Sequence, residues 1–216
     1  MLSLLLDAAW MTLGLALASL VGGMVLALAF SAAELSKQRW LVWPVATLTT
    51  LIRGLPELLV VLFIYFGSTQ VLFLITGEYV EFSPFACGVL ALSLLFASYA
   101  TQTLRAALNA VPAGQRLAAL ALGLGKRHIF FRIVLPQAWR HALPGLGNQW
   151  LVLLKDTALV SLIGVNEMMR QAQMASASTY QPFTWYAAAA LIYLAISLVS
   201  EFGLKQASRY TRRYGG

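Results

Sequence analysis

Several polar side chains lie inside long apolar stretches of this sequence, where charge is costly and needs a reason. Arg105 lies one helical turn after Gln102, and Asp156 lies seven residues after Gln149, on the same face of a helix. A guanidinium can bind a carboxylate through two hydrogen bonds, and a carboxylate can hold a cation. These residues could therefore bind a polar solute, or Arg105 and Asp156 could neutralise each other. The candidate pathway residues are Gln102, Arg105, Gln149, Asp156, Thr157 and Ser161.

Two further pairs of opposite charge have spacings that favour contact along one helix. Arg53 and Glu57 are four residues apart, and so are Glu201 and Lys205. Side chains at this spacing are neighbours on a helix surface. Both pairs are therefore predicted to be local ion pairs near the ends of apolar segments, where a long basic side chain can reach water.

The composition is that of a protein surrounded by lipid. Hydrophobic residues make up 60% of the 216 residues, charged residues make up 11%, and the mean hydropathy is +0.75. Soluble domains carry about 25% charged residues, and runs of about 18 apolar residues are typical of membrane spans. We therefore predict an all-α membrane protein with a single domain, residues 1–216. Its five expected transmembrane helices are residues 4–30, 48–75, 85–111, 143–164 and 183–204.

Small residues on the first span predict a close contact with another helix. Gly14, Ala18 and Gly22 recur every four residues and so lie along one face. In lipid, such a face lets a second helix approach closely.

Basic residues are concentrated in alternate connections between the predicted spans. The connections 31–43 and 112–142 and the segment after residue 204 are basic, whereas 76–84 has no basic residue and 165–182 has a single arginine. Basic segments flank the cytoplasmic ends of membrane spans. We therefore expect the N-terminus outside and the C-terminus in the cytoplasm. The formal charge of +7 then reflects membrane orientation rather than nucleic-acid binding.

Segment 112–142 is too long for a turn and too regular for a disordered loop. Residues 115–122 form a predicted short helix rich in alanine and leucine, which Gly123 and Gly125 end. A second helix is predicted for 126–135, and Pro136 should stop it. A short apolar helix flanked by charge can dock in a groove of a partner protein or lie on lipid headgroups. The composition and spacing of this segment are compatible with both.

The same segment resembles a family motif. Its residues match the spacing of the EAA loop of binding-protein-dependent ABC importer permeases, which is Glu-Ala-Ala, three residues, Gly, nine residues and Ile-x-Leu-Pro. In that family the loop forms the coupling helix that sits on the ATPase subunit. Leu117 replaces the usual acid here, which removes one polar contact. The resemblance makes Leu117, Ala118, Ala119, Gly123, Ile133, Leu135 and Pro136 candidate ATPase-coupling residues.

The resemblance covers nearly the whole chain. Residues 53–56, 142–148 and 155–161 resemble parts of the second and fourth spans of polar amino-acid permeases of the histidine and arginine permease family. This implies a type I ABC importer permease fold, with a cytoplasmic coupling loop at about 112–135, and a role in amino-acid import. Arg105 would then bind the substrate carboxylate, Asp156 its positive charge, and Gln102 would add hydrogen bonds. Asp156 favours a basic amino acid such as arginine, and neutral polar amino acids such as glutamine stay open.

The resemblance also implies partners. Separate ATPase subunits would bind ATP and Mg, a second permease subunit (a copy or a paralogue) would complete the pathway, and a soluble binding protein would deliver the amino acid to the bacterial inner membrane. No nucleic acid is expected.

The chain itself is not expected to be an enzyme. It has no phosphate-binding loop, because Arg127 follows Gly125-Lys126 and Leu120 occupies the first glycine position. No spacing of histidine, cysteine and acidic residues suggests a metal site, so no metal and no cofactor are expected in this chain. Two rival classes are an ATP-independent secondary transporter or channel and a membrane enzyme such as an intramembrane protease.

Overall fold

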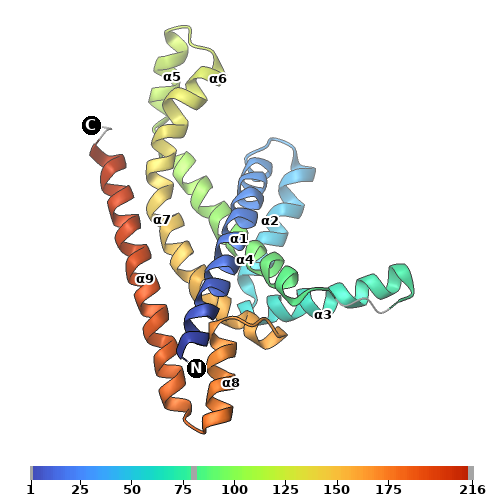
Figure 1. The fold of residues 1–216 in the computed structure, drawn as a ribbon. Coiled ribbons are helices and arrows are strands. Elements are labelled where there is room, and N and C mark those ends of the chain that lie inside the picture. The colour runs from blue at the N-terminus through green and yellow to red at the C-terminus, as the bar shows by residue number, and fades with distance from the viewer. Residues whose placement is uncertain (1, 79–81, 214–216) are drawn as a thin grey trace.

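The computed structural model describes residues 2–78 and 82–213, and every element in these ranges is a helix (Figure 1). Three long helices, α1 (Leu2–Glu34), α4 (Pro84–Ala110) and α7 (Leu135–Asp156), pack together and supply much of the core. The other elements are α2 (Arg39–Gly54), α3 (Glu57–Thr76), α5 (Ala113–Ala121), α6 (Lys126–Ile129), the π-helix η1 (Phe130–Val134), the 3₁₀ helix η2 (Thr157–Ile163), α8 (Met168–Thr179) and α9 (Pro182–Arg213).

Helices α1 and α4 approach closely where α1 has two consecutive glycines. A Cβ atom at Gly22 would lie 2.7 Å from Ser93 Oγ, and one at Gly23 would lie 3.0 Å from the Ser93 carbonyl oxygen. Ser93 Oγ donates a hydrogen bond of 3.2 Å to the carbonyl of Ser19 across this contact. Nothing lies within 4 Å of a Cβ at Gly14. The predicted stripe of small residues is therefore not one continuous contact, because crossing helices touch over a limited length.

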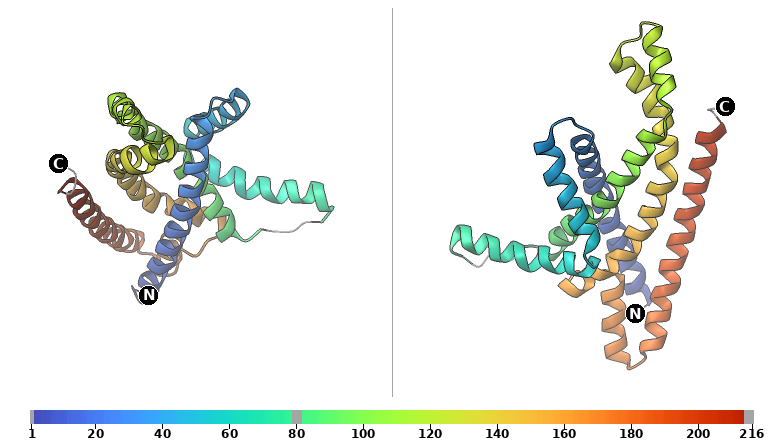
Figure 2. Two further views of the ribbon diagram at one scale, coloured as in Figure 1. Left: turned by 90° about the horizontal axis from the view of Figure 1, so that it is seen from above. Right: turned by 180° about the vertical axis from the view of Figure 1, so that it is seen from behind.

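The segment predicted as one span, 48–75, is two helices, and this prediction was wrong. α2 ends at Gly54, and Leu55 is extended, with φ −97° and ψ 148°. The ring of Pro56 disfavours a helical conformation in the residue before it, so the chain turns there and α3 starts at Glu57. α3 then leaves the bundle sideways (Figures 1 and 2).

The segment predicted as the fourth span, 143–164, also consists of two elements. α7 begins earlier than predicted and ends at Asp156, and the chain continues as the tighter helix η2 until Gly164, whose φ is +95°. Four helices of the described residues are long and apolar enough to cross a membrane, and α7, which carries more polar residues, is not among them. The four are Ser3–Glu34, Glu57–Thr76, Pro84–Ala110 and Pro182–Arg209.

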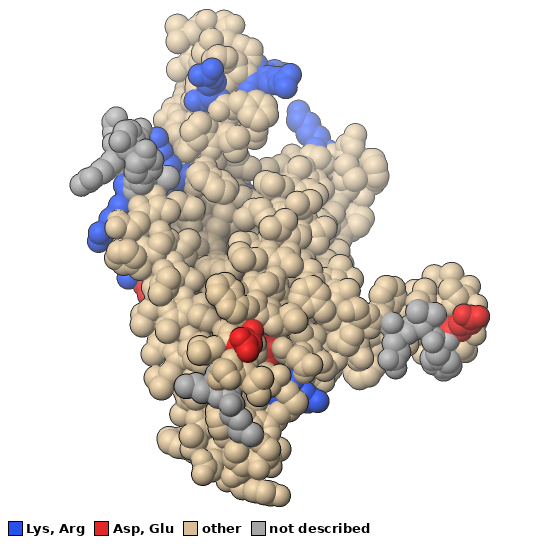
Figure 3. Space-filling view, viewed as in Figure 1, with Lys and Arg blue, Asp and Glu red and all other residues tan. Residues whose placement is uncertain are grey.

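The two ends of the molecule differ in charge. α5 and α6 project at one end, near the C-terminal end of α9, while the N-terminus and the turn between α8 and α9 lie toward the other end (Figure 1). On the face drawn in Figure 3, the basic side chains gather mostly at the end that carries α5 and α6. The fold thus brings the basic connections 31–43 and 112–142 to one end, as a consistent membrane topology requires.

Candidate functional site

Two half-buried carboxylates from different helices lie within electrostatic reach of each other. Glu57 is in the first turn of α3, and Asp156 is the last residue of α7. The two repel each other, and the neighbouring Lys155 partly offsets this for Asp156. The Tyr99 hydroxyl on α4 interacts with both carboxylates and with the guanidinium of Arg53. Two carboxylates that interact electrostatically, with a phenol coupled to both, can hold a cation that also donates hydrogen bonds.

The break at Pro56 gives Arg53 and Glu57 separate positions. Arg53 lies at the end of α2, and its Nε donates a hydrogen bond of 3.1 Å to the carbonyl of Thr49. The predicted local ion pair between Arg53 and Glu57 is wrong, since no salt bridge joins them in the described structure. The cause is that the two residues do not share one continuous helix. The predicted pair Glu201–Lys205 is confirmed, with Nζ 2.6 Å from Oε1.

Arg105 has a partner of its own, which is not Asp156. Its Nη1 donates to Oε2 of Glu34, the last residue of α1. The Glu34 side chain is 1% exposed, and its Oε1 accepts a hydrogen bond of 3.1 Å from Thr49 Oγ1. The alternative that Arg105 and Asp156 neutralise each other is therefore wrong. Glu34 instead links the end of α1 to α2 and α4, a contact that sequence reasoning missed because Arg105 is far from Glu34 along the chain.

The remaining pathway candidates lie in two places. Gln149 Nε2 donates a hydrogen bond of 2.7 Å to Thr103 Oγ1 and so links α7 to α4, while Gln102 lies half-buried on α4. Thr157 and Ser161 are buried in η2, and each hydroxyl donates a hydrogen bond of 2.7 Å to the carbonyl three residues earlier. The structure therefore does not gather the six candidates around one point.

A second buried carboxylate organises the opposite end of the molecule. Glu167 is fully buried, its Oε1 accepts the backbone N–H of Arg170 at 2.8 Å, and its Oε2 accepts the Tyr193 hydroxyl at 2.9 Å. Beside it, the Met168 backbone N–H donates a hydrogen bond of 3.1 Å to Thr12 Oγ1 on α1. Glu167 lies in the connection 165–182, and burial raises the pKa of its carboxyl. Sequence reasoning missed this residue, for which the only signal was an acid at the start of a helix.

The short helix α5 is shaped by a glycine cap and a small core of its own. Gly123 has φ +75°, and the N–H groups of Gly123 and Leu124 donate to the carbonyls of Leu120 and Ala119, which is the Schellman pattern at a helix end. Ala119 is buried among Val111, Ile129, Val134 and Ala138. Leu117 is 66% exposed and Ala118 is also exposed, so these residues rather than Ala119 are free for a partner.

The segment after α5 differs from the prediction at Pro136. α6 passes into the π-helix η1 and then into α7, with Pro136 in the first turn of α7, so the helix is not stopped there. Proline fits the first turn of a helix because no hydrogen bond from its nitrogen is needed there, and the wider π-turn lets the chain continue. Ile133 packs against the small core under α5, while Leu135 and Pro136 are exposed.

Comparison with known proteins decides the family. The pattern of binding-protein-dependent transport system inner membrane components matches residues 19–213 of the chain. The chain belongs to this family. The permease is 57% identical to the arginine ABC transporter permease protein ArtQ of Haemophilus influenzae, over 98% of this chain and 95% of the relative. It is 38% identical to the histidine/lysine/arginine/ornithine transport system permease protein HisQ of Salmonella typhimurium, over 91% and 88% of the two chains.

Solved structures agree with the fold. A crystal structure of an amino acid ABC transporter with histidines is similar with a TM-score of 0.86 and 30% identity, covering 96% of this chain and 94% of the other. An inward-facing MetNI methionine ABC transporter gives a TM-score of 0.75 at 19% identity, covering 96% of both chains, and supports the fold alone. The predicted all-α fold of a type I ABC importer permease is therefore confirmed.

Proposed function

We propose that this permease forms the translocation pathway of an ATP-driven importer for amino acids, with arginine or another basic amino acid as its substrate. The observation that carries the substrate class is the approach of the Glu57 and Asp156 carboxylates. Two negative charges at membrane depth are costly unless a cation accompanies them. A guanidinium or ammonium side chain would supply that cation during passage. The names of relatives such as ArtQ and HisQ support the same class.

The substrate carboxylate needs a cationic partner, for which two arginines are candidates. Arg105 is the first candidate, with Gln102 adding hydrogen bonds to the substrate. To bind the substrate carboxylate, Arg105 would have to release Glu34. Arg53 is the second candidate, because its guanidinium already lies near Tyr99. Gln149, Thr157 and Ser161 would act at the edges of the pathway, since each already has a hydrogen-bond partner within the protein.

Competitive uptake tests the substrate site. Cells that express the permease with its ATPase and binding protein would take up labelled arginine in the presence of unlabelled glutamine. We expect Asp156→Asn and Glu57→Gln to reduce arginine uptake about 10-fold or more, because each removes one charge from a cation site. Asp7→Asn, which removes an exposed acid on α1, is the matched control. Unchanged selectivity in both cluster variants would remove these residues from the site.

Coupling to a separate ATPase is proposed to occur at α5. The exposed Leu117 and Ala118 would enter a groove of the ATPase subunit, while the buried Ala119 and the cap at Gly123 hold the helix in place. Ile133, Leu135 and Pro136 would transmit movement of α5 into α7. ATP and Mg would be bound by the ATPase, and this chain would hold no cofactor of its own.

The ATP dependence of uptake distinguishes an ATP-driven importer from an ATP-independent transporter. In proteoliposomes, uptake should require ATP and the ATPase subunits, and a secondary transporter or channel would move solute without them. Ala118→Arg should abolish the stimulation of ATP hydrolysis by substrate-loaded binding protein, because it places a long charged side chain where α5 presents a small exposed residue. Ala118→Ser keeps the side chain small and should retain stimulation. Equal coupling in both variants would move the docking site away from α5.

A second permease subunit and the orientation complete the proposal. A copy of this chain or a paralogue would complete the pathway, and the apolar helix α3, which leaves the bundle, would be available to it. The basic end that carries α5 would face the cytoplasm, and the turn between α8 and α9 would face the outer side of a bacterial inner membrane. Binding of ATP and its hydrolysis would then shift the bundle between outward-open and inward-open states.

A further inference from the structure

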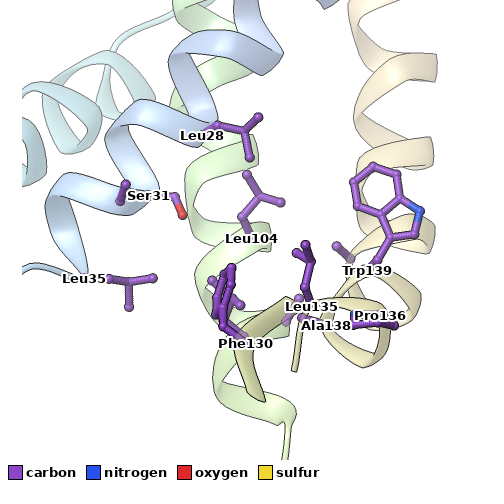
Figure 4. Close-up of a pocket in the computed structure, with 13 residues that line it drawn as sticks. Leu28, Ser31, Leu35, Leu104, Phe130, Leu135, Pro136, Ala138 and Trp139 are labelled. Atoms are coloured by element: carbon purple, nitrogen blue, oxygen red, sulfur yellow. The ribbon is translucent and has the colours of Figure 1, made fainter. Parts of the chain in front are cut away.

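A large apolar cavity lies near the basic end of the permease, apart from the proposed substrate site. Its volume is about 790 Å³, and neither Glu57 nor Asp156 lines it. Figure 4 shows α4 behind the cavity, α1 on one side and the start of α7 on the other, with the Ser31 hydroxyl as a lone oxygen among carbon atoms. Its apolar walls are formed mainly by Leu28, Leu35, Leu104, Phe130, Leu135 and Trp139.

The cavity is open to the surroundings of the protein. Leu28 is 55% exposed, Trp139 is 45% exposed and Phe130 is 41% exposed, and all three line it. Around a membrane protein, the apolar material at such a surface is the acyl chains of lipids. Tryptophan is enriched where acyl chains meet headgroups. Trp139 therefore indicates that the cavity lies at the depth where one lipid presents both its chain and its headgroup.

Two basic residues lie next to the cavity in sequence. Lys37 follows the lining residue Leu35 by two positions, and Arg132 lies between the lining residues Phe130 and Leu135. Lys37 and Arg132 are exposed, and neither forms a salt bridge among residues 2–78 and 82–213. Basic pockets between helices at the cytoplasmic side of a membrane are suited to anionic lipid headgroups. Lys37 and Arg132 do not line the cavity themselves but border its lining residues along the chain, where the headgroup of a lipid with its acyl chain in the cavity would lie.

We propose that this cavity binds an anionic phospholipid, with one acyl chain between α1 and α7 and the headgroup against Lys37 and Arg132. Because Phe130 and Leu135 belong to the segment that joins α5 to the bundle, the lipid steadies the connection between the coupling helix and α1. The site is separate from the substrate cluster. It can therefore fail while the proposed transport function stands.

Quenching of Trp139 by brominated lipids tests the site. The full chain, purified in detergent micelles, is titrated with phosphatidylglycerol or phosphatidylcholine that carry the same dibrominated chains, and the contribution of Trp139 is obtained by subtraction with Trp139→Phe. We expect saturable quenching of Trp139 at a lower mole fraction of phosphatidylglycerol than of phosphatidylcholine. Lys37→Gln and Arg132→Gln should each weaken phosphatidylglycerol binding roughly fivefold. Arg170→Gln, which removes an exposed charge outside the cavity, should not.

A second set of variants tests the apolar half of the site. Ala32 lines the cavity from an exposed position on α1, so Ala32→Phe fills the space without displacing buried atoms. It should abolish saturable quenching, whereas Ala29→Phe, exposed on the same helix but outside the cavity, should leave it unchanged. Equal quenching by the two lipids in all variants would mean bulk lipid only and overturn the proposal. Loss of quenching when a second permease subunit is co-purified would assign the cavity to a partner helix and overturn it as well.

Discussion

Two ion pairs between a glutamate and a basic residue contribute differently to stability because one is largely buried and the other is exposed. Glu34 is 1% exposed in its side chain and holds both Arg105 and Thr49, whereas the pair Glu201–Lys205 lies at the surface, with side chains 43% and 64% exposed. A buried carboxylate that loses its partner keeps its desolvation cost, while an exposed one is solvated again. The stability of the bundle should therefore depend on the first pair and hardly on the second.

Replacing Glu34 by Gln should destabilise the permease by about 1–3 kcal/mol, less than the 3–5 kcal/mol typical of a fully buried pair because a third of Arg105 is exposed. Glu201→Gln should change the free energy of unfolding by about 0.5 kcal/mol or less. Unfolding in mixed micelles, followed by circular dichroism, measures both. Equal effects of the two substitutions would show that Glu34 is not a structural contact.

Glu167 predicts a dependence of stability on pH. Burial raises the pKa of this carboxyl above its ordinary value in the unfolded chain. For an acid with a raised folded-state pKa, the stabilising contribution is complete below the ordinary pKa and is lost as the pH rises through the raised pKa. Glu167→Gln cannot ionise, and its amide can still accept from Arg170 N–H and donate to the Tyr193 oxygen. The variant should therefore gain stability relative to the wild type as the pH rises above the ordinary glutamate pKa of about 4.3 and through the raised pKa of the folded state.

The pH dependence is measured as the difference in unfolding midpoint between Glu167→Gln and the wild type, with an exposed acid as the control. Unfolding midpoints of wild type and Glu167→Gln are measured in the same detergent at each pH, and Asp7→Asn, an exposed acid, should run parallel to the wild type. A constant difference between Glu167→Gln and the wild type across the series would mean that Glu167 does not ionise in this range.

At the scale of elements, the contact between α1 and α4 depends on the absence of side chains at two positions of α1. A side chain at Gly23 would meet Phe96 Cδ1 at 2.8 Å and the backbone of Ser93 at 3.0 Å, so one of the helices would have to move. Packed interiors respond to excess volume with strain. The glycines at this crossing therefore set the distance between the two helices.

Gly23→Leu should destabilise the permease by about 1–3 kcal/mol through overpacking. Gly14→Leu, on the same helix with nothing within 4 Å of the new Cβ, should stay within about 0.5 kcal/mol of the wild type. Both are measured by unfolding in micelles. Similar losses for both variants would attribute the effect to helix α1 in general and not to its contact with α4.

The sequence predicted the order of the helices better than their interruptions. Hydropathy averages over many residues, so it located the apolar stretches but joined α2 and α3 across Pro56 and did not separate η2 from α7. The ion pair Glu201–Lys205 could be predicted because both residues share one helix. The partner of Arg105, in contrast, lies 71 positions away along the chain. The cluster of Glu57 with Asp156 likewise depends on how α3 and α7 each pack on α4 and η2, which no local sequence pattern records.

At the scale of the whole molecule, two ends with different chemistry predict one orientation. The end with α5 carries the basic connections and exposes Leu117 and Leu122, and the turn between α8 and α9 lies toward the opposite end (Figure 1). Translocating the basic end would require several unpaired charges to cross the bilayer. The substrate cluster of Glu57 and Asp156 belongs to two elements, α3 and α7, that both contact α4 and η2.

Cysteine labelling from either side of the membrane checks this orientation. Cys87, the one cysteine of the chain, is buried and is first replaced by serine, which leaves a background without reactive thiols. Leu122→Cys, at an 80% exposed position beside α5, and Gln181→Cys, in the turn between α8 and α9, then mark the two ends. An impermeant maleimide applied to intact spheroplasts should label position 181 and not position 122, and inverted vesicles should give the opposite result. Labelling of position 122 from outside would reverse the topology and separate α5 from any cytoplasmic ATPase.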